Sequence, residues 1–290
     1  MSDLHALVRE ATARLEAAGI RSPEADAVEL AAFVLGTDAG DVRRAMVLRT
    51  APDAGFTTTF DTLVEERRTR VPLQHLTGRA HFRRLTLAVG PGVFVPRPET
   101  EVTAGIAIDA ASEVGAGVVV VDLCTGSGAI ALAVKDELPE ATVLAVELSD
   151  LAHGWAVANR DRLGLDVEVR LGDATTAFDE LMDEVDVVVS NPPYIPVGAV
   201  PLDPEVRDHD PAVALYGGST DGLAVPLAVA GRAAALLRDG GVLVMEHADS
   251  QGEILPAALR ETGQWGVVVD HLDLAGRPRT TVAVRRRAQG

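Results

Sequence analysis

Apolar side chains recur at every third or fourth position over the first seventy residues, which is the spacing of helices that bury one face. The first series ends before Gly19 and consists of Leu4, Leu7, Val8, Ala11 and Leu15. Ser22 and Pro23 are typical of an N-cap and a first helical position, and they predict a second helix that ends near Gly36. A third helix is expected over residues 57–70. The pattern therefore predicts a small helical domain at residues 1–78.

The pattern changes to short extended stretches between residues 79 and 96. Arg84–Val89 and Val93–Val95 have the composition of strands, and the Gly-Pro-Gly sequence at 90–92 favours a turn between them. We therefore expect a β-hairpin linker over residues 79–96 that joins two domains.

Valine-rich runs alternate with helical segments over residues 97–290. Strands that are buried on both faces of a parallel sheet require such nearly continuous apolar runs. The expected strands are residues 118–123, 142–147, 167–171, 185–190, 242–246, 267–272 and 280–285. A turn around Gly276 and Pro278 separates the last two and predicts an antiparallel hairpin. We expect one α/β domain built on a mostly parallel seven-stranded sheet.

The formal net charge of −17 is unevenly distributed along the chain. Residues 1–90 hold 12 arginines and 12 acidic residues, so the whole excess of negative charge falls in residues 91–290. An acidic surface repels phosphate backbones and gains little from counterion release. We therefore expect no stable binding to nucleic acid.

Composition also restricts the chemistry and the compartment. Cys124 is the only cysteine, which rules out an intramolecular disulfide and a multi-cysteine metal site. The seven histidines lack the spacing of metal ligands, and no apolar run reaches the ~18 residues of a membrane span. No segment resembles a signal peptide. We expect a cytoplasmic protein that acts as a monomer and binds neither a metal nor a membrane.

A glycine-rich loop follows the first expected strand. Its residues are Asp122, Leu123, Cys124, Thr125, Gly126, Ser127 and Gly128. Glycines let the backbone turn sharply and approach a ligand closely, and doubly wound sheets bind ligands at the carboxyl ends of their strands. The loop lacks the complete G-x-G-x-x-G spacing, which weakens the case for a dinucleotide. We interpret Cys124 as a small packed side chain rather than a nucleophile, because no base lies near it in sequence.

Acidic residues follow the next two expected strands. Glu147 ends the second strand, where its carboxylate can accept hydrogen bonds from both hydroxyls of a ribose. Asp173 and Ala174 follow the third strand, where an acid can accept from an adenine amino group. Each acid taken alone, Asp122 included, is equally typical of a cap or an exposed strand end. Three at successive strand ends favour a nucleoside cofactor, and S-adenosylmethionine in particular.

The fourth expected strand is followed by Asn191, Pro192, Pro193 and Tyr194. The side-chain oxygen of Asn191 and the backbone carbonyl of Pro192 can each accept one N–H of a planar NH2 group. The prolines make the turn rigid and remove donors, and Tyr194 offers a flat face for packing. We interpret Asn191, Pro192 and Tyr194 as catalytic residues that hold a planar nitrogen close to an electrophilic methyl group, so that Asn191 also contacts the cofactor. An incidental Asn-Pro turn is the alternative, and the motif does not separate glutamine from adenine or cytosine.

Five stretches together resemble the release-factor glutamine N5-methyltransferases of the HemK/PrmC type. They are PLQHLTG at 72–78, FVPRPETE at 94–101, VDLCTGSGAIAL at 121–132, VVSNPPYIP at 188–196 and EHADSQG at 246–252. The resemblance covers nearly the whole chain. It implies a Rossmann-like methyltransferase domain, preceded by a helical domain that helps to dock a class I peptide chain release factor.

The resemblance also implies a reaction. A methyl group would pass from S-adenosyl-L-methionine to the glutamine of the Gly-Gly-Gln motif, leaving S-adenosyl-L-homocysteine. By position, the loop at Cys124–Gly128 and Glu147 would bind the cofactor, Asp173 and Ala174 would lie beside its adenine, and Asn191–Tyr194 would hold the glutamine. Glutamine methylation of a ribosomal protein stays open, as do amino methylation of adenine or cytosine in nucleic acid and a non-catalytic nucleotide-binding module.

The sequence departs from the commonest form of the family at three places. Cys124 stands where glycine is usual, so an ordinary backbone conformation is expected there, and Glu147 stands where aspartate is usual. Asp210 precedes a proline where glutamate is more typical, within the segment 195–222. That segment is too long and too rich in proline and aspartate for a simple connector, so we expect a substrate-side loop. Arg97 is expected either to structure the pocket entrance or to form a surface salt bridge.

Overall fold

The computed structural model describes residues 3–286, which form two compact units. The first, here called the helical unit, contains the chain up to Arg79 together with Pro201–His209. The second, the sheet unit, contains Ala80–Val200 and the chain from Asp210 onward. Residues 201–209 thus pack with the helical unit, although sequence order places them inside the expected domain at 97–290.

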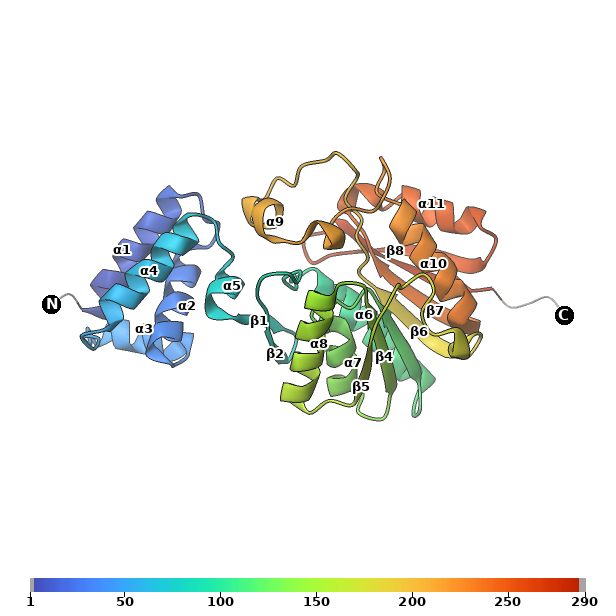
Figure 1. Cartoon of the computed structure of the whole chain (residues 1–290), viewed down its shortest axis with the longest axis horizontal. Coiled ribbons are helices and arrows are strands. Elements are labelled where there is room, and N and C mark those ends of the chain that lie inside the picture. The colour runs from blue at the N-terminus through green and yellow to red at the C-terminus, as the bar shows by residue number, and fades with distance from the viewer. Residues whose placement is uncertain (1–2, 287–290) are drawn as a thin grey trace. The chain divides into compact units, whose positions relative to one another are not determined.

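Five helices and one returning segment form the helical unit (Figure 1). Their bounds are Leu4–Ala17 (α1), Pro23–Leu35 (α2), Ala39–Val47 (α3), Phe56–Arg68 (α4), Leu73–Thr77 (α5) and Pro204–His209 (α9). The core contains fully buried side chains from α1, α2 and α4, such as Leu15, Leu30 and Phe60. These are the three helices that the apolar spacing predicts. The sequence analysis missed α3 and α5, because α3 buries only Val42 and α5 buries no residue fully, so neither has a periodic apolar face.

The linker hairpin lies earlier in the chain than expected. Its strands are Arg79–Phe82 (β1) and Leu85–Ala88 (β2), and the turn between them has Arg83 at a φ of +51°. A turn does lie at Pro91 and Gly92, but it joins no two strands, because Val93–Val95 forms none. The glycines there serve close packing instead, because a Cβ on Gly90 would lie 2.7 Å from the ring of Trp155.

The seven-stranded sheet forms as predicted. Its strands are Val119–Leu123 (β3), Thr142–Glu147 (β4), Val167–Leu171 (β5), Val185–Ser190 (β6), Leu237–Glu246 (β7), Trp265–Leu272 (β8) and Pro278–Arg285 (β9). The strand order is β5-β4-β3-β6-β7-β9-β8, and all neighbours are parallel except β9, which is antiparallel to β7 and β8. The strand order reverses between β3 and β6, and doubly wound sheets bind ligands at such a point.

Helices cover both faces of this sheet (Figure 1). Thr100–Val114 (α6), Ala129–Glu137 (α7) and Asp150–Leu163 (α8) cover one face, and Ala224–Leu236 (α10) and Ile254–Glu261 (α11) cover the other. Val120 packs into the first core and its neighbour Val121 into the second, and both are fully buried. Burial on both faces is therefore the reason why the strands read as continuous valine runs. No helix among residues 3–286 is long and apolar enough to cross a membrane.

Candidate active site

Two candidate segments leave neighbouring strands at the point where the strand order reverses. Leu123 of β3 pairs with Ser190 of β6, and the Ser190 hydroxyl donates a hydrogen bond to the Leu123 carbonyl. The glycine loop, defined as Cys124–Gly128, follows the first of these residues directly, and the NPPY turn, defined as Asn191–Tyr194, follows the second. The structure thus places both segments at the same level of one sheet edge.

Asp122 holds the glycine loop by hydrogen bonds from the protein interior. Its Oδ2 accepts hydrogen bonds from the Thr125 hydroxyl at 2.6 Å and from the Ala131 N–H at 3.1 Å. Burial raises the pKa of Asp122 to about 7, although both hydrogen bonds lower it. Its Oδ1 is buried and has no hydrogen-bond partner within residues 3–286. The side chain therefore shapes the loop from within the protein.

The backbone of Cys124 differs from the expected ordinary conformation. Its φ is +70°, in the left-handed region that favours glycine, so that expectation was wrong. The chain must reverse here, because the next N–H, that of Thr125, donates to the Val146 carbonyl of β4 at 3.0 Å. Burial also raises the pKa of the Cys124 thiol, which keeps it protonated and unsuited to nucleophilic attack.

The two glycines of the loop have different roles. Gly128 has a φ of +84°, and a Cβ there would lie 2.9 Å from Leu132 Cδ1, so close packing requires glycine. Gly126 has a φ of +60°, but a Cβ there would meet nothing within 4 Å. Gly126 therefore borders open space, where a ligand can approach the backbone of the loop.

The acids at the next two strand ends also bind backbone groups. Glu147 accepts from the Gly126 N–H at 2.8 Å through Oε2 and from the Ser149 N–H at 2.9 Å through Oε1. The exposed Asp173 accepts from the N–H and the hydroxyl of Thr175, and these hydrogen bonds lower the pKa of Asp173. Ala174 beside it is buried.

These residues fit a nucleoside. β3, β4 and β5 are adjacent in the sheet, so Asp122, Glu147 and Asp173 follow one another along its carboxyl edge. Each oxygen of Glu147 accepts one N–H and keeps lone-pair capacity for a hydroxyl group. The half-buried Glu147 carboxylate beside the open face of Gly126 therefore suits a ribose.

The NPPY turn presents free acceptors. Asn191 Nδ2 donates to the Thr100 hydroxyl at 3.3 Å. Within residues 3–286, neither Asn191 Oδ1 nor the Pro192 carbonyl accepts a hydrogen bond from the protein. The turn therefore carries two oxygens able to bind the two hydrogens of an NH2 group.

Glu246 at the end of β7 orients this arrangement, and the sequence analysis assigned it no role. Glu246 is 2% exposed, and its carboxylate lies 3.5 Å from the Tyr194 hydroxyl. Burial raises the pKa of Glu246 to about 7, while hydrogen bonds from Thr100 and Thr103 lower it. The hydrogen bond from the Thr100 hydroxyl lowers the pKa of Glu246 because Thr100 donates to the carboxylate, and the same hydroxyl oxygen accepts from Asn191 Nδ2. The amide of Asn191 is thereby fixed with its oxygen free.

Gln251 and Gly222 hold the backbone of the same turn, and they were also missed. Gln251 is 2% exposed, and its Nε2 donates to the Tyr194 carbonyl at 2.9 Å and to the Asp221 carbonyl at 2.8 Å. A Cβ on Gly222 would lie 2.1 Å from the Tyr194 carbonyl oxygen. Glu246 and Gln251 both belong to the EHADSQG stretch, and this stretch was the available signal.

Arg97 forms a partly buried ion pair. Its guanidinium lies 2.7 Å from Asp210 Oδ2, and the Asp210 side chain is fully buried. The same guanidinium lies 5.1 Å from the centre of the Phe94 ring. Burial of the acid makes this pair more than a surface salt bridge, and it holds Asp210 of the segment 195–222 within the sheet unit.

The chain is similar in sequence to known proteins over nearly its whole length. Residues 6–78 match the family model described as the PrmC N-terminal domain, and residues 85–201 match the methyltransferase small domain. A release factor glutamine methyltransferase of Streptomyces coelicolor is 50% identical over 98% of this chain and 98% of its own length. The chain belongs to the release factor glutamine methyltransferase family. A member from Mycolicibacterium smegmatis is 46% identical over 98% of this chain and 99% of its own length.

Two further similarities are to a relative named for a different substrate and to a solved structure. A protein of Streptomyces pristinaespiralis, named 4-amino-L-phenylalanine/4-methylamino-L-phenylalanine methyltransferase, is 40% identical over 88% of this chain and 87% of its own length. A crystal structure of a methyltransferase from Pyrococcus furiosus superimposes with a TM-score of 0.51 at 17% identity, covering 69% of this chain and 89% of that one. The latter supports the methyltransferase fold of the sheet unit.

Proposed function

We propose that this enzyme transfers the methyl group of S-adenosylmethionine to the side-chain amide nitrogen of the glutamine in the Gly-Gly-Gln motif of class I release factors. The observation that carries this proposal is 50% identity over 98% of the chain to a relative of that name. The two free acceptors of the NPPY turn support it, because a primary amide has two hydrogens to bind.

The glycine loop and the acidic strand ends hold the cofactor. S-adenosylmethionine supplies an electrophilic methyl group on a sulfonium. Glu147 would accept from the ribose hydroxyls, Asp173 and Ala174 would border the adenine, and the open face of Gly126 would let the backbone approach the ligand. Asp122, Cys124, Thr125 and Gly128 keep the loop in this conformation, and the Ser127 carbonyl accepts a hydrogen bond from Asn159 Nδ2.

The NPPY turn positions the nitrogen that is methylated. An amide nitrogen is a weak nucleophile because its lone pair is delocalised, so alignment at ~3 to 3.5 Å from the methyl group has to supply much of the rate. Asn191 Oδ1 and the Pro192 carbonyl would each accept one N–H, while Tyr194 and Pro193 pack against the planar group. Glu246 and Thr100 keep the Asn191 amide in the orientation that this requires.

Incubation with labelled S-adenosylmethionine tests the assignment. Purified release factor, ribosomal protein and DNA are offered separately, and mass spectrometry locates the label. We expect one methyl group on the Gly-Gly-Gln glutamine. Label only on DNA or only on a ribosomal protein contradicts the proposal. We further infer that the enzyme acts in the cytoplasm and as a monomer. We also infer that it does not bind nucleic acid stably, and the net charge of −17 supports this last point.

A free aromatic amine is a second candidate substrate. The 40% identical relative is named for methylation of 4-amino-L-phenylalanine, whose amino group is also a planar nitrogen with two hydrogens. A further arm of the same assay therefore contains 4-amino-L-phenylalanine. Faster turnover of this small molecule than of release factor would favour the second candidate.

A further inference from the structure

Residues 201–209 of the loop that begins directly after the NPPY turn pack with the helical unit. Hydrogen bonds from the Ile195 N–H to the Leu215 carbonyl, at 2.7 Å, and from the Gly217 N–H to the Ile195 carbonyl, at 2.9 Å, close its base within the sheet unit. Between these points, Pro201–His209 with its helix α9 groups with the helical unit. The loop is therefore shared between the two units.

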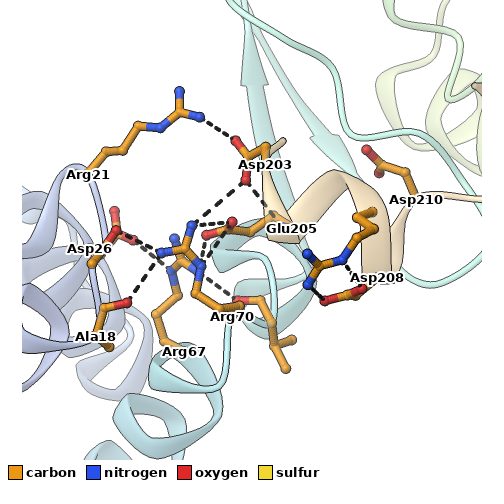
Figure 2. Close-up of polar contacts among 12 residues, drawn as sticks. Ala18, Arg21, Asp26, Arg67, Arg70, Asp203, Glu205, Asp208 and Asp210 are labelled. Carbon is orange, nitrogen blue, oxygen red and sulfur yellow. Dashed lines mark hydrogen bonds and ion pairs between the residues drawn. The ribbon is translucent and has the colours of Figure 1, made fainter. Parts of the chain in front are cut away.

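Glu205 of α9 makes the attachment (Figure 2). Its Oε1 accepts from Arg67 Nη1 at 2.9 Å, and its Oε2 accepts from Arg70 Nη2 at 2.6 Å and from Arg70 Nε at 3.1 Å. The Glu205 side chain is 11% exposed and that of Arg67 is 9% exposed. One carboxylate thus binds two guanidinium groups away from solvent.

The helical unit holds both arginines by further contacts. Arg67 Nε donates to Asp26 Oδ2 of α2 at 2.7 Å, and Arg70 Nη1 donates to the Gly19 carbonyl at 2.7 Å. Both guanidinium groups are therefore oriented by the helical unit before α9 is considered. Asp203 adds a bond to Arg21 at 2.8 Å, but Arg21 is 79% exposed, so that pair contributes little.

The negative charge of Glu205 is what compensates the positive charges of Arg67 and Arg70 in this cluster. Burial raises the pKa of Glu205, but hydrogen bonds with Asp203, Arg67 and Arg70 outweigh it and lower the pKa to about 2. Glu205 is therefore ionised at neutral pH. Without its charge, Arg67 and Arg70 would face Asp26 and the more distant Asp203, whose carboxylate lies 3.8 Å from Arg70. Loss of one partner from a buried ion cluster is strongly unfavourable.

We propose that Glu205 is a positioning residue that fastens residues 201–209 of the substrate-side loop to the helical unit, so that this segment and the helices recognise the protein substrate as one body. A loop fixed in advance avoids the entropy cost of ordering when the substrate binds. The inference rests on the proposed function, because recognition by the helical unit requires a protein substrate.

Steady-state kinetics of Glu205→Gln test the proposal with two substrates. The variant keeps the size of the side chain and removes its charge. For full-length release factor we expect KM to rise about tenfold with kcat within about twofold of wild type, which corresponds to about 1.4 kcal/mol of binding. For a short peptide containing Gly-Gly-Gln we expect kcat/KM to be unchanged, because such a peptide reaches only the NPPY turn.

Matched variants separate anchoring from a general loss of folding. Asp208→Asn on the same helix removes a carboxylate that pairs with Arg207 at 2.7 Å on the exposed side, and we expect it to behave as wild type. Glu205→Arg combined with Arg70→Glu reverses one pair and should restore part of the lost affinity. Full peptide activity of Glu205→Gln in the same preparation shows that the sheet unit is folded.

Three results would overturn the proposal. They are an unchanged KM for full-length release factor, an equal loss with protein and peptide, and the same defect in Asp208→Asn. If wild-type enzyme methylates neither substrate, the proposed function fails on its own. Hydrogen exchange then tests whether Glu205 holds the segment. The backbone amides of residues 201–209 should exchange faster in Glu205→Gln than in wild type, and equal exchange rates contradict the inference.

Discussion

The glycine loop and the NPPY turn leave neighbouring strands, but they are held in different ways. The loop is fixed by residues close to it in sequence or on the adjoining strand, such as Asp122 and Val146. The turn is fixed by three side chains from two distant parts of the chain, namely Thr100 and the stretch that contains Glu246 and Gln251. The cofactor side is thus built locally, whereas the substrate side depends on the assembled fold.

Asn191→Ala tests the substrate side most severely. The change removes the oxygen proposed to accept one amide hydrogen, and the substrate loses its alignment with the methyl group. We expect kcat to fall by roughly 10³-fold, comparable to the loss of a positioned hydrogen-bonding group in other enzymes. Calorimetry with S-adenosylhomocysteine should show a Kd within about tenfold of wild type. Unchanged turnover would mean that the gripping role belongs to another residue.

Gly222→Ala tests whether the turn depends on its distant partners. A Cβ at this position would lie 2.1 Å from the Tyr194 carbonyl oxygen and 2.9 Å from Gln251 Nε2. We expect the displaced turn to lower kcat by about 10²-fold, since small misplacements have effects of that size, and thermal unfolding to begin at a lower temperature. Gly198→Ala is the control, because Gly198 also has a positive φ, +88°, but a Cβ there meets nothing within 4 Å. Equal behaviour of the two variants would show that backbone strain alone is responsible.

The sequence predicted the locally built parts of the molecule well. The strand ends at Glu147, Leu171 and Ser190 were placed correctly because valine runs end sharply there, and the sheet architecture followed from them. The hairpin turn was misplaced because the glycines at 90 and 92 serve packing against Trp155 and Leu151, which no local pattern reveals. The same limit hid Glu246, whose role depends on Thr100 and Tyr194, residues far from it in sequence.

The pairing of α9 with the helical unit shows this limit most clearly. Segment 195–222 was expected to be a substrate-side loop from its length and composition alone. Its attachment through Glu205 requires Arg67 and Arg70, which lie over a hundred residues earlier in the chain. A single sequence contains no periodic signal for an ion pair of that kind, because each member reads as an ordinary surface charge.

Glu246 on the substrate side and Asp122 on the cofactor side are both buried carboxylates with raised pKa values, so both should make stability depend on pH. Burial raises the pKa of Glu246 to about 7 in the folded protein, above its value in the unfolded chain. The stabilising contribution is therefore complete below the unfolded pKa and is lost as pH rises through about 7. Since one pKa unit corresponds to about 1.4 kcal/mol, the loss is on the order of 3 kcal/mol.

Glu246→Gln should remove this pH dependence. We expect the variant to gain stability relative to wild type as pH rises from 5 to 8 in urea denaturation. Glu253→Gln changes an exposed glutamate nearby and should follow the wild-type curve. Parallel curves for wild type and Glu246→Gln would show that Glu246 titrates normally. We expect Asp122 on the cofactor side to contribute to the pH dependence of stability in the same direction, because burial also raises its pKa to about 7.

Cys124 offers the smallest test, on the locally built side. Its φ of +70° costs a residue other than glycine about 1–2 kcal/mol, whereas glycine loses about 0.5–1 kcal/mol through its freer unfolded chain. Cys124→Gly and Cys124→Ala both remove the sulfur, but only glycine relieves the backbone. We therefore expect Cys124→Gly to be more stable than Cys124→Ala by about 1 kcal/mol or less in denaturant titrations, with both retaining cofactor binding. Greater stability of the alanine variant would mean that the left-handed conformation at this position is not strained, and that the usual glycine of the family is required there for close approach of the ligand.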